Sequence, residues 1–401
     1  MHDAVTHKPP SPVTATDPDV FISGGGPAGL ACAIAATQQG LTVEVADGMR
    51  PPIDKACGEG LMPDTLEALA QLGVGPAVLA TVESHPFCGI RFLGASGVRG
   101  AKNTGTLSTQ ATFPVGEGRG MRRILLHQLL IDRATALGVR LNWETVVQGL
   151  EPGKGTGRSV VRTNRHAVHP RFVIGADGHQ SRIRAWAGLD RASISARRIG
   201  LRQHFAIVPW SDCVEVYWSN YGQAYVTPVA ADEICVAFIA DRKFPSVEAA
   251  LTCFPELQQH LAAALASNTP RGSITLSRKL HRVTRDNIAL VGDASGSFDA
   301  VTGEGLGLCF RQSLALAQAL RSGDLGAYQQ AHLELQRLPH FMGRTMLLLD
   351  SYPRLRVRTL TALQRRPRFF QQMLRVHVGE APLRLFGSTG LLASFLCILA
   401  G

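Results

Sequence analysis

Short apolar runs, separated by glycine-rich turns and by segments with helical periodicity, organise most of this chain. An apolar run at 19–23 leads into a glycine-rich turn, an alanine-rich segment occupies 30–39, and a second apolar run follows at 42–46. This order predicts a βαβ unit, in which a helix connects two neighbouring parallel strands. Apolar positions three and four residues apart predict further helices at 63–73 and 121–137.

The middle of the chain changes to a succession of strands. Apolar and alternating runs predict strands at 199–208, 214–218, 224–229 and 234–239, between segments of the βαβ type. The expected fold class is therefore α/β (α+β), a Rossmann-type domain that carries an inserted antiparallel sheet. A helical pattern is expected at 246–266 and again from residue 324 to about residue 378.

Composition narrows the class of protein. Hydrophobic residues make up 45% of the chain and charged residues 18%, which excludes a disordered protein. Eight cysteines without a C-x-x-C pair give no zinc signature, so we predict no metal site and a reducing, cytoplasmic location. The first 18 residues are polar and lack the apolar core of a signal peptide, and no apolar stretch is long enough to span a membrane.

The first chemical motif is the turn that joins the first strand to the first helix. Its glycines follow the spacing G-x-G-x-x-G. The first glycine permits a tight turn, the second lets the backbone approach a pyrophosphate, and the third lets the helix pack closely on the strand. The helix N-terminus then stabilises the phosphate charge. Asp47 ends the second strand, where it can accept a hydrogen bond from a ribose hydroxyl. The candidate cofactor residues of the turn are Gly24, Gly26, Pro27, Ala28 and Gly29.

Two later strands also end in an aspartate. Asp177 and Gly178 follow the strand at 172–175, and Asp293 follows the strand at 288–291. A glycine-rich turn then opens a long helix, whose first amide groups can face a negatively polarised ligand. The candidate residues of that turn are Gly303, Gly305 and Leu306.

These three motifs, in this order, resemble those of the FAD-dependent aromatic hydroxylase-like flavoproteins, a group that includes a geranylgeranyl-reductase-like branch. The resemblance covers roughly residues 19–340 and implies a bound FAD. It places Asp47 at the adenosine ribose, Arg123 at the phosphates or the ribityl chain, and Asp177 near the pyrophosphate. It also places Asp293 at the ribityl or pyrophosphate region and the later glycine turn against the flavin ring. Because the chain has a single G-x-G-x-x-G turn, NAD(P)H is expected to bind only transiently as the electron donor.

The resemblance and the element pattern together predict the domain boundaries. We expect, in order, a disordered lead-in, a discontinuous FAD-binding domain, a substrate-binding sheet domain, and a basic helical segment with an apolar tail. The boundaries are 1–18 for the lead-in; 19–80, 116–190 and 281–340 for the FAD-binding domain; 81–115 and 191–280 for the sheet domain; and 341–401 for the C-terminal segment.

Two segments supply candidate catalytic residues. The turn at 54–61 resembles the lysine–x–cysteine–glycine turn that lies beside the flavin in the reductase branch. It makes Cys57 and Glu59 candidates, against the alternatives of a packing thiol and a solvated carboxylate. On a later strand, alternation places Arg202 and His204 on one face, where both are expected to contact substrate. His204 is the third catalytic candidate, and a purely structural histidine is the alternative.

The strand end at Tyr225, Thr227 and Pro228 completes the predicted substrate contacts. In the family a proline here faces the flavin across the substrate cavity, and the reductases carry a tryptophan and a lysine beside it. This chain has neither, which favours a monooxygenase that uses NAD(P)H and O2 on an aromatic, quinone or lipophilic secondary metabolite. The alternative is a reductase or dehydrogenase of a prenyl or alkyl double bond. A non-catalytic flavin-binding or membrane-associated protein is a third hypothesis.

The net charge of +10 is concentrated near the C-terminus. Residues 341–401 hold nine arginines against two acidic residues, and the run at 391–400 is apolar. Two interpretations stay open: a helical cap with a solvated basic face, or peripheral contact of the segment with an anionic membrane. A nucleic-acid partner is not expected, because the arginines are not interleaved with stacking aromatic residues. The sequence does not distinguish a monomer from a dimer.

Overall fold

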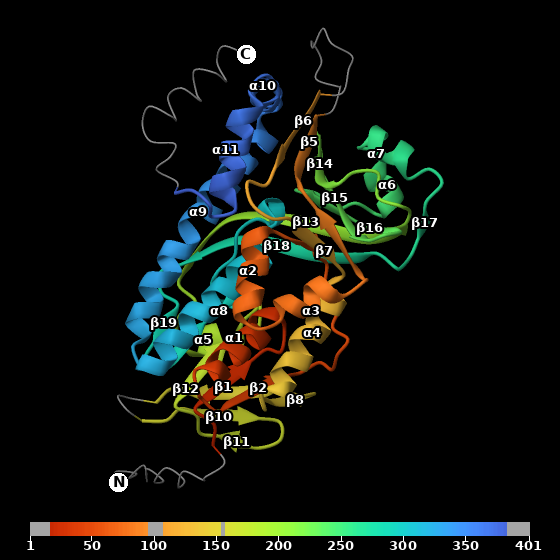
Figure 1. The fold of residues 1–401 in the computed structure, drawn as a ribbon. Coiled ribbons are helices and arrows are strands. Elements are labelled where there is room, and N and C mark those ends of the chain that lie inside the picture. The colour runs from red at the N-terminus through yellow and green to blue at the C-terminus, as the bar shows by residue number, and fades with distance from the viewer. Residues whose placement is uncertain (1–16, 95–106, 154–156, 383–401) are drawn as a thin grey trace, which may run out of the picture.

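The computed structural model describes residues 17–94, 107–153 and 157–382 (Figure 1). The predicted lead-in is therefore outside the described residues except for its last two, and these two are docked. Asp17 accepts a hydrogen bond from the backbone N–H of His169, and the carbonyl of Pro18 accepts one from Arg158. The apolar run at 391–400 and Arg384 also lie outside the described residues.

A six-stranded sheet, ordered β19–β20–β12–β1–β2–β8, forms the base of the half of the molecule that contains the N-terminal βαβ unit (Figure 1). Every neighbouring pair is parallel except β19–β20. Because parallel strands end at the same edge, the turns that follow β1, β2, β12 and β20 gather there. The strands are β1 (Val20–Ser23), β2 (Val43–Asp47), β8 (Arg140–Trp143), β12 (Phe172–Gly175), β19 (Thr284–Arg285) and β20 (Ile288–Leu290).

Three helices cover one face of this sheet, with α1 packed against both of the others. They are α1 (Pro27–Gln38), α4 (Arg123–Ala136) and α8 (Gly305–Ser322). Small side chains make α1 apolar on all sides, and most of its residues are buried in the main core. A small sheet lies on the opposite side in Figure 1 and shares that core. It consists of β9 (Val147–Glu151), β10 (Val160–Thr163) and β11 (Ala167–Val168), and the short helix α5 (Arg182–Trp186) packs beside it.

The second half is an eight-stranded sheet ordered β17–β13–β16–β15–β14–β5–β6, with β18 paired to β13. The predicted antiparallel sheet is present, although its β14–β5 pair is parallel. The 15-residue β13 pairs with β16, β17 and β18 of this sheet. Its first residue, Ala192, packs against the main core of the other half. The strands are β5 (Gly89–Gly94), β6 (Leu107–Thr112), β13 (Ala192–Ala206), β14 (Cys213–Ser219), β15 (Gly222–Ala230), β16 (Glu233–Ala240), β17 (Leu265–Ala266) and β18 (Arg271–Leu280).

Smaller elements connect the two halves. A three-stranded sheet, ordered β3–β7–β4, packs on β15. Its middle strand pairs with the other two strands and packs against β15 of the large sheet. The expected helix at 246–266 is wrong as one element: Pro255 starts a second helix, since the residue before a proline is biased away from helical geometry. The remaining elements are β3 (Gly60–Leu61), β4 (Ser84–Phe87), β7 (Gly118–Met121), α2 (Pro63–Gln71), α3 (Gly75–Ala80), α6 (Val247–Leu251), α7 (Pro255–His260) and the 3-10 turns η1 (Gly292–Ser295) and η2 (Ala300–Thr302).

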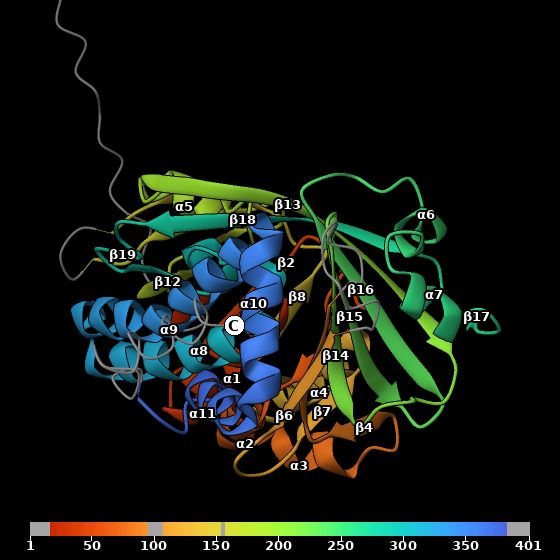
Figure 2. The ribbon, with the colours of Figure 1, turned by 90° about the horizontal axis from the view of Figure 1, so that it is seen from above.

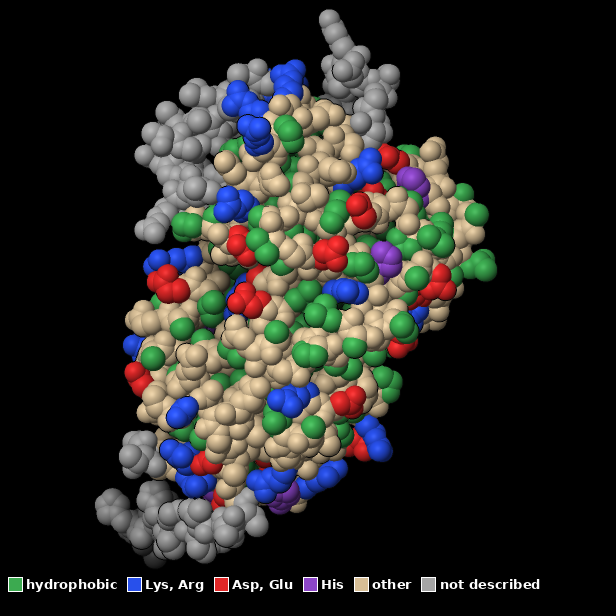
Figure 3. Space-filling view, viewed as in Figure 1, with side chains coloured by type: hydrophobic (Ala, Val, Ile, Leu, Met, Phe, Trp, Pro, Cys, Tyr) green, Lys and Arg blue, Asp and Glu red, His purple; other side chains and the backbone are tan. Residues whose placement is uncertain are grey.

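Three C-terminal helices follow α8: α9 (Leu325–Ser351), α10 (Pro353–Arg365) and α11 (Pro367–His377). The view from above shows α10 and α11 between the two halves, whereas α9 lies beside α8 (Figure 2). Helices α10 and α11 pack on β6, and Phe370 of α11 stacks on Phe92 of β5 with ring centroids 5.1 Å apart. Figure 3 shows Lys and Arg side chains gathered on the outer end of this helical region. The described helices thus form a cap with a solvated basic face, and none of them is both long and apolar enough to cross a membrane.

Candidate active site

One cavity of about 1130 Å³ joins the two halves. At one end it is lined by the turns after β1, β2, β12 and β20 of the parallel sheet. At the other end it is lined by apolar side chains of the large sheet and of helices α9 to α11. Representative apolar lining residues are Phe92, Val216, Trp218, Met346, Leu363 and Phe370. The predicted cofactor motifs therefore line one end of a continuous cavity, and an apolar chamber forms its other end.

The turn after β1 has the shape that a pyrophosphate requires. Gly24 has a φ of +110°, and a Cβ at this position would lie 2.4 Å from the carbonyl oxygen of Ala176. A Cβ on Gly29 would lie 1.8 Å from the carbonyl oxygen of Gly24, so helix and strand pack without room for a side chain. A Cβ on Gly26 would meet no atom within 4 Å, because this residue faces the cavity at the N-terminus of α1. The cradle therefore fits a phosphate group placed against Gly26.

Asp47 is held at the end of β2 by two backbone groups. Its Oδ2 accepts from the N–H of Gly25 at 2.7 Å, and its Oδ1 accepts from the N–H of Met49 at 2.8 Å. Each carboxylate oxygen keeps a further acceptor site, so the side chain can also take a ribose hydroxyl. His127 of α4 also holds the turn after β1, because its Nε2 lies 2.7 Å from the carbonyl oxygen of Gly25. No motif in the sequence indicates this role of His127.

Arg123 lies at the start of α4 and lines the cavity. Its side chain is 7% exposed and donates to the carbonyl oxygen of Ile53 at 2.7 Å. Lys55 and Arg182 line the same cavity. These three cations and the amide groups of α1 form a donor set suited to the phosphates of a dinucleotide.

The two later aspartates lie on facing loops. The carboxylate of Asp177 accepts from the N–H of Arg182 at 2.7 Å and so closes its own turn, in which Gly178 has a φ of +78°. Asp293 is half exposed and lies 3.2 Å from Nε2 of His179. Both aspartates line the cavity, and so does His179, which no sequence motif indicates.

The glycine turn before α8 presents bare backbone to the cavity. A Cβ on Gly303 or Gly305 would meet no atom within 4 Å, and Gly303 has a φ of +67°. The preceding residues are held by Tyr225 of β15, whose hydroxyl lies 2.7 Å from the carbonyl oxygen of Val301. The N-terminus of the 18-residue helix α8 thus faces the cavity with its positive end, as the predicted flavin ring site requires. Together with the Gly26 cradle and the basic lining, this geometry fits FAD.

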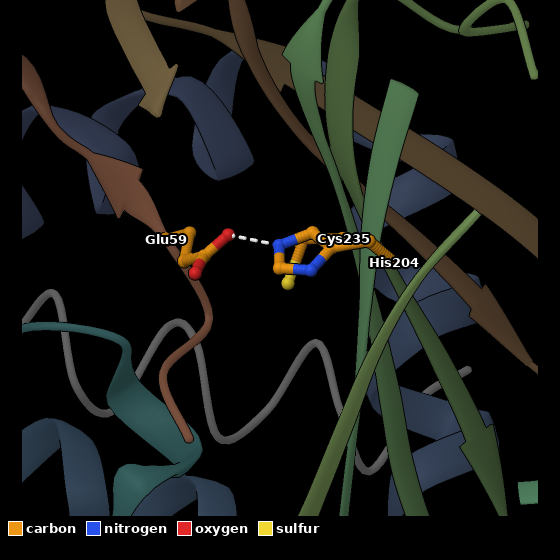
Figure 4. Close-up of side chains that lie close together, drawn as sticks. All are labelled: Glu59, His204 and Cys235. Atoms are coloured by element: carbon orange, nitrogen blue, oxygen red, sulfur yellow. Dashed lines mark hydrogen bonds and ion pairs between the residues drawn. The ribbon is translucent and has the colours of Figure 1, made fainter. Parts of the chain in front are cut away.

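The predicted catalytic residues Glu59 and His204 form a buried pair (Figure 4). Oε2 of Glu59 lies 2.5 Å from Nε2 of His204, and Oε1 accepts from the N–H of Arg123 at 3.0 Å. Glu59 lines the cavity and has a φ of +61°, which is unusual for a residue with a side chain. Its carboxylate therefore satisfies an orphan N–H of α4 and connects the cavity wall to β13.

The contacts of His204 fix which ring nitrogen carries the proton. Nδ1 faces two donors, Nη1 of Arg202 at 3.0 Å and Nδ2 of Asn268 at 2.6 Å, so it must accept. Asn268 is oriented by its own Oδ1, which accepts from the N–H of His204. The proton is therefore on Nε2 and is donated to Glu59. Alternation correctly placed Arg202 beside His204, but both side chains lie behind the cavity wall, and Arg202 pairs with Asp54.

Cys57 lies in the same wall and lines the cavity. Burial and the neighbouring Glu59 carboxylate raise the pKa of the Cys57 thiol, so the protonated form is favoured. Its sulfur accepts a hydrogen bond from the N–H of Glu59 at 3.4 Å. The buried Cys235 donates to the carbonyl oxygen of Cys57 at 3.6 Å and is also close to the Glu59–His204 pair (Figure 4).

The predicted substrate contacts divide between the cavity and the surrounding core. Tyr225 and Thr227 line the cavity, whereas Pro228 does not. The carbonyl oxygen of Pro228 would lie 1.7 Å from a Cβ on Gly120, so this residue packs against β7. The turn at 54–61 covers the face of β13 that carries Arg202 and His204, which alternation alone cannot reveal.

A second buried pair was not predicted from the sequence. Glu304, immediately before α8, and His377, the last residue of α11, both line the cavity, with Oε1 and Nδ1 3.5 Å apart. Burial raises the pKa of Glu304 to about 8 and lowers the pKa of His377 to about 4. The position of Glu304 between Gly303 and Gly305 was the available sequence signal. No sequence signal indicated His377, because it is distant from Glu304 in sequence and lies in an arginine-rich helix.

The raised pKa of Glu304 predicts a pH dependence of stability. Between pH 6.5 and pH 8 the folded protein keeps a proton on Glu304 that the unfolded chain has released, so rising pH destabilises the wild type. Glu304→Gln lacks the titrating group and so lacks this loss. The difference in free energy of unfolding between the variant and the wild type should therefore shift by about 2 kcal/mol in favour of the variant from pH 6.5 to pH 8. Urea unfolding of both proteins at the two pH values measures it. A difference between the proteins that does not change with pH would contradict the assignment.

Comparison with known proteins agrees with this geometry. A family profile described as an FAD binding domain matches residues 17–333. The chain belongs to this family of FAD-binding proteins. The match confirms the resemblance stated from the sequence motifs, the predicted fold class and FAD as the cofactor.

Several proteins with similar sequences carry the names of enzymes. A 6-methylpretetramide 4-monooxygenase of Streptomyces rimosus is 28% identical over 44% of this chain, and an FAD-dependent monooxygenase of Aspergillus terreus is 27% identical over 43%. These alignments span only 32% and 25% of the two relatives' lengths. A second alignment to a protein with the first of these names, at 24% identity, covers 95% of this chain and 97% of the relative. A menaquinone reductase of Mycolicibacterium smegmatis is 25% identical, with 84% of this chain and 86% of the relative covered.

Solved structures share the fold. A flavoprotein/dehydrogenase from Cytophaga hutchinsonii superposes with a TM-score of 0.76 at 19% identity, covering 91% of this chain and 94% of that one. The p-nitrophenol 4-monooxygenase of Pseudomonas putida superposes with a TM-score of 0.74 at 15% identity, covering 89% and 96%.

Proposed function

We propose that this protein is an FAD-dependent monooxygenase that takes its electrons from NAD(P)H and transfers one oxygen atom from O2 to an aromatic, quinone or otherwise lipophilic molecule. The observation that carries the proposal is the single cavity that joins the dinucleotide cradle to an apolar chamber. Relatives named as monooxygenases support it. FAD, when bound, supplies the redox chemistry and the activation of O2.

The protein's own contribution is to bind, orient and exclude water. The Gly26 cradle, Asp47 and Arg123 hold the cofactor, and the turn at 303–305 supports its ring. The apolar walls around Phe92 and Trp218 desolvate a hydrophobic substrate beside that ring. Glu59, fixed by His204, keeps this wall in place. NAD(P)H enters transiently, because the chain has one dinucleotide turn.

The second candidate function is reduction of a prenyl or alkyl double bond. It is favoured by Cys57 in its glycine-rich turn and by relatives named as menaquinone and digeranylgeranylglycerophospholipid reductases. The raised pKa of the Cys57 thiol argues against a thiolate at this site at neutral pH. The absence of the tryptophan and lysine beside Pro228 also favours the monooxygenase.

Two kinetic measurements separate these functions. For a monooxygenase, the holoprotein should oxidise NAD(P)H with consumption of O2, faster with a phenol or quinol present. Cys57→Ala should leave this rate within about twofold of the wild type, because no step uses a thiolate. Anaerobic reoxidation of the reduced flavin by menaquinone or a geranylgeranyl lipid, abolished by Cys57→Ala, would instead establish the reductase.

Peripheral membrane contact and a cytoplasmic location remain predictions. The apolar faces of α10 and α11 are used inside the protein: Leu363, Phe370 and Leu374 are buried in one cluster with the large sheet. Any membrane contact therefore rests on the tail at 391–400, together with the exposed arginines of the C-terminal helices.

A further inference from the structure

The apolar chamber contains two polar side chains that the cofactor motifs do not use. Glu304 is 6% exposed and His377 is 8% exposed, and both line the cavity. Oε2 of Glu304 and Nδ1 of His377 are buried, and no hydrogen bond within the described residues reaches either atom; Nδ1 lies 3.5 Å from Oε1 of Glu304. Buried polar groups in folded proteins are nearly always hydrogen-bonded. This pair is therefore a place where a ligand's polar group completes the site.

The surroundings of the pair are apolar. Phe370, Leu374 and His377 occupy one face of α11, because they are four and three residues apart. Met62 and Leu363 belong to the same buried cluster as Phe370 and Leu374. An aromatic or aliphatic ligand can therefore pack here and bring a single polar group to the two side chains.

Charge decides which polar group fits. Burial favours the neutral forms of both side chains at neutral pH, as a carboxylic acid and an imidazole. Arg311, which is itself paired with Asp64, lowers the pKa of His377 further and so also favours the neutral imidazole. A neutral carboxyl donates one hydrogen bond, and a neutral imidazole accepts one. The complementary group is a hydroxyl, which can accept from Glu304 and donate to His377 without carrying charge into the chamber.

We propose that Glu304 and His377 form a specificity site that binds the hydroxyl group of a phenolic ring lodged in the apolar chamber. The terminal torsions of both side chains are soft, so small rotations bring their polar atoms to the ligand. Helix α8 contributes the donor and helix α11 the acceptor, so the C-terminal cap takes part in substrate recognition. This inference rests on the proposed function in one respect only, namely that the substrate binds in this cavity.

Binding of three matched probes to the holoprotein tests the site. The probes are 2-naphthol, 2-methoxynaphthalene, which cannot donate a hydrogen bond, and naphthalene, which has no oxygen. Dissociation constants are read from the change in flavin absorbance, without turnover. The wild type should bind 2-naphthol roughly three- to tenfold more tightly than 2-methoxynaphthalene.

Variants then assign that preference to the pair. His377→Phe should remove it, because the naphthol hydroxyl then has no acceptor. Glu304→Met should instead weaken the binding of both oxygen-bearing probes relative to naphthalene, since a hydroxyl oxygen and a methoxy oxygen can each accept from the Glu304 carboxyl. Glu304→Gln, which still donates, should leave both affinities close to those of the wild type. His340→Phe is the matched control, since this histidine lies on α9 and does not line the cavity. The two variants act on different helices, so a folding defect in one leaves the other informative.

A preference for 2-naphthol that survives His377→Phe would overturn the site. So would a Glu304→Met variant that binds both oxygen-bearing probes as the wild type does, or a wild type that shows no preference. These outcomes are independent of the proposed reaction, because binding is measured without electrons or O2. A protein that oxygenates a substrate but binds all three probes alike fails this inference alone. A protein with the full preference but no oxygenation fails the proposed function alone.

Discussion

Gly26→Ala should abolish or severely weaken FAD binding while leaving the apoprotein folded. The new methyl group would meet no protein atom within 4 Å, so the fold has no reason to change. It would, however, project into the cavity at the N-terminus of α1, where a phosphate must approach the backbone. We expect the dissociation constant for FAD to rise by at least about tenfold, a loss of about 1.4 kcal/mol or more. Titration of the apoprotein with FAD, together with circular dichroism, measures both parts.

Gly149→Ala provides the matched control. This glycine lies in β9, away from the cavity, and its added methyl group would be 3.8 Å from the side chain of Arg162. Its affinity for FAD should equal that of the wild type. Gly29→Ala should behave differently from both and lose stability as well, because its Cβ would lie 1.8 Å from a carbonyl oxygen. Normal FAD affinity in Gly26→Ala would show that the phosphates bind elsewhere.

Arg198→Leu should cause the largest loss of stability. Arg198 of β13 is buried between Asp299 at 3.5 Å and Asp350 at 3.0 Å, and so joins the large sheet, the turn before α8 and helix α9. Removing the cation leaves two partly or wholly buried carboxylates uncompensated, which typically costs about 3–5 kcal/mol. Burial already raises the pKa of both aspartates, so protonation should relieve part of the loss at acidic pH. Urea unfolding at pH 5 and pH 8 should therefore show the larger deficit at pH 8.

The control for this variant is Arg162→Leu, which breaks an exposed ion pair with Glu151. Such surface pairs contribute less than about 1 kcal/mol, so its stability should remain close to that of the wild type. Equal effects of the two substitutions, or a deficit of Arg198→Leu that does not depend on pH, would contradict the proposed role of the buried network.

The cofactor end of the site could be predicted because its chemistry is local. Gly24, Gly26 and Gly29 lie within six residues, and Asp47 ends the very next strand, so strand order alone brings them together. The later aspartates follow strands of the same parallel sheet, which places them at the same edge. Backbone geometry fixes these positions with little help from distant side chains.

The substrate end could not be predicted because it depends on which surfaces face each other. Alternation correctly placed Arg202 and His204 together, but not the turn that covers them and contributes Glu59. The pairing of Glu304 with His377 depends on how α11 packs over the large sheet. That packing is decided by apolar side chains such as Phe92 and Phe370, which the sequence shows only as ordinary core residues.

Turnover of 2-naphthol under ¹⁸O2 tests the monooxygenase proposal most directly. The holoprotein, supplied with NAD(P)H in ordinary water, should yield a product that carries one ¹⁸O atom, and the same reaction in H2¹⁸O under ordinary O2 should yield none. Mass spectrometry of the extracted product reads both. If NAD(P)H and O2 were consumed and the probe acquired no ¹⁸O, the cavity described here would not be that of a monooxygenase.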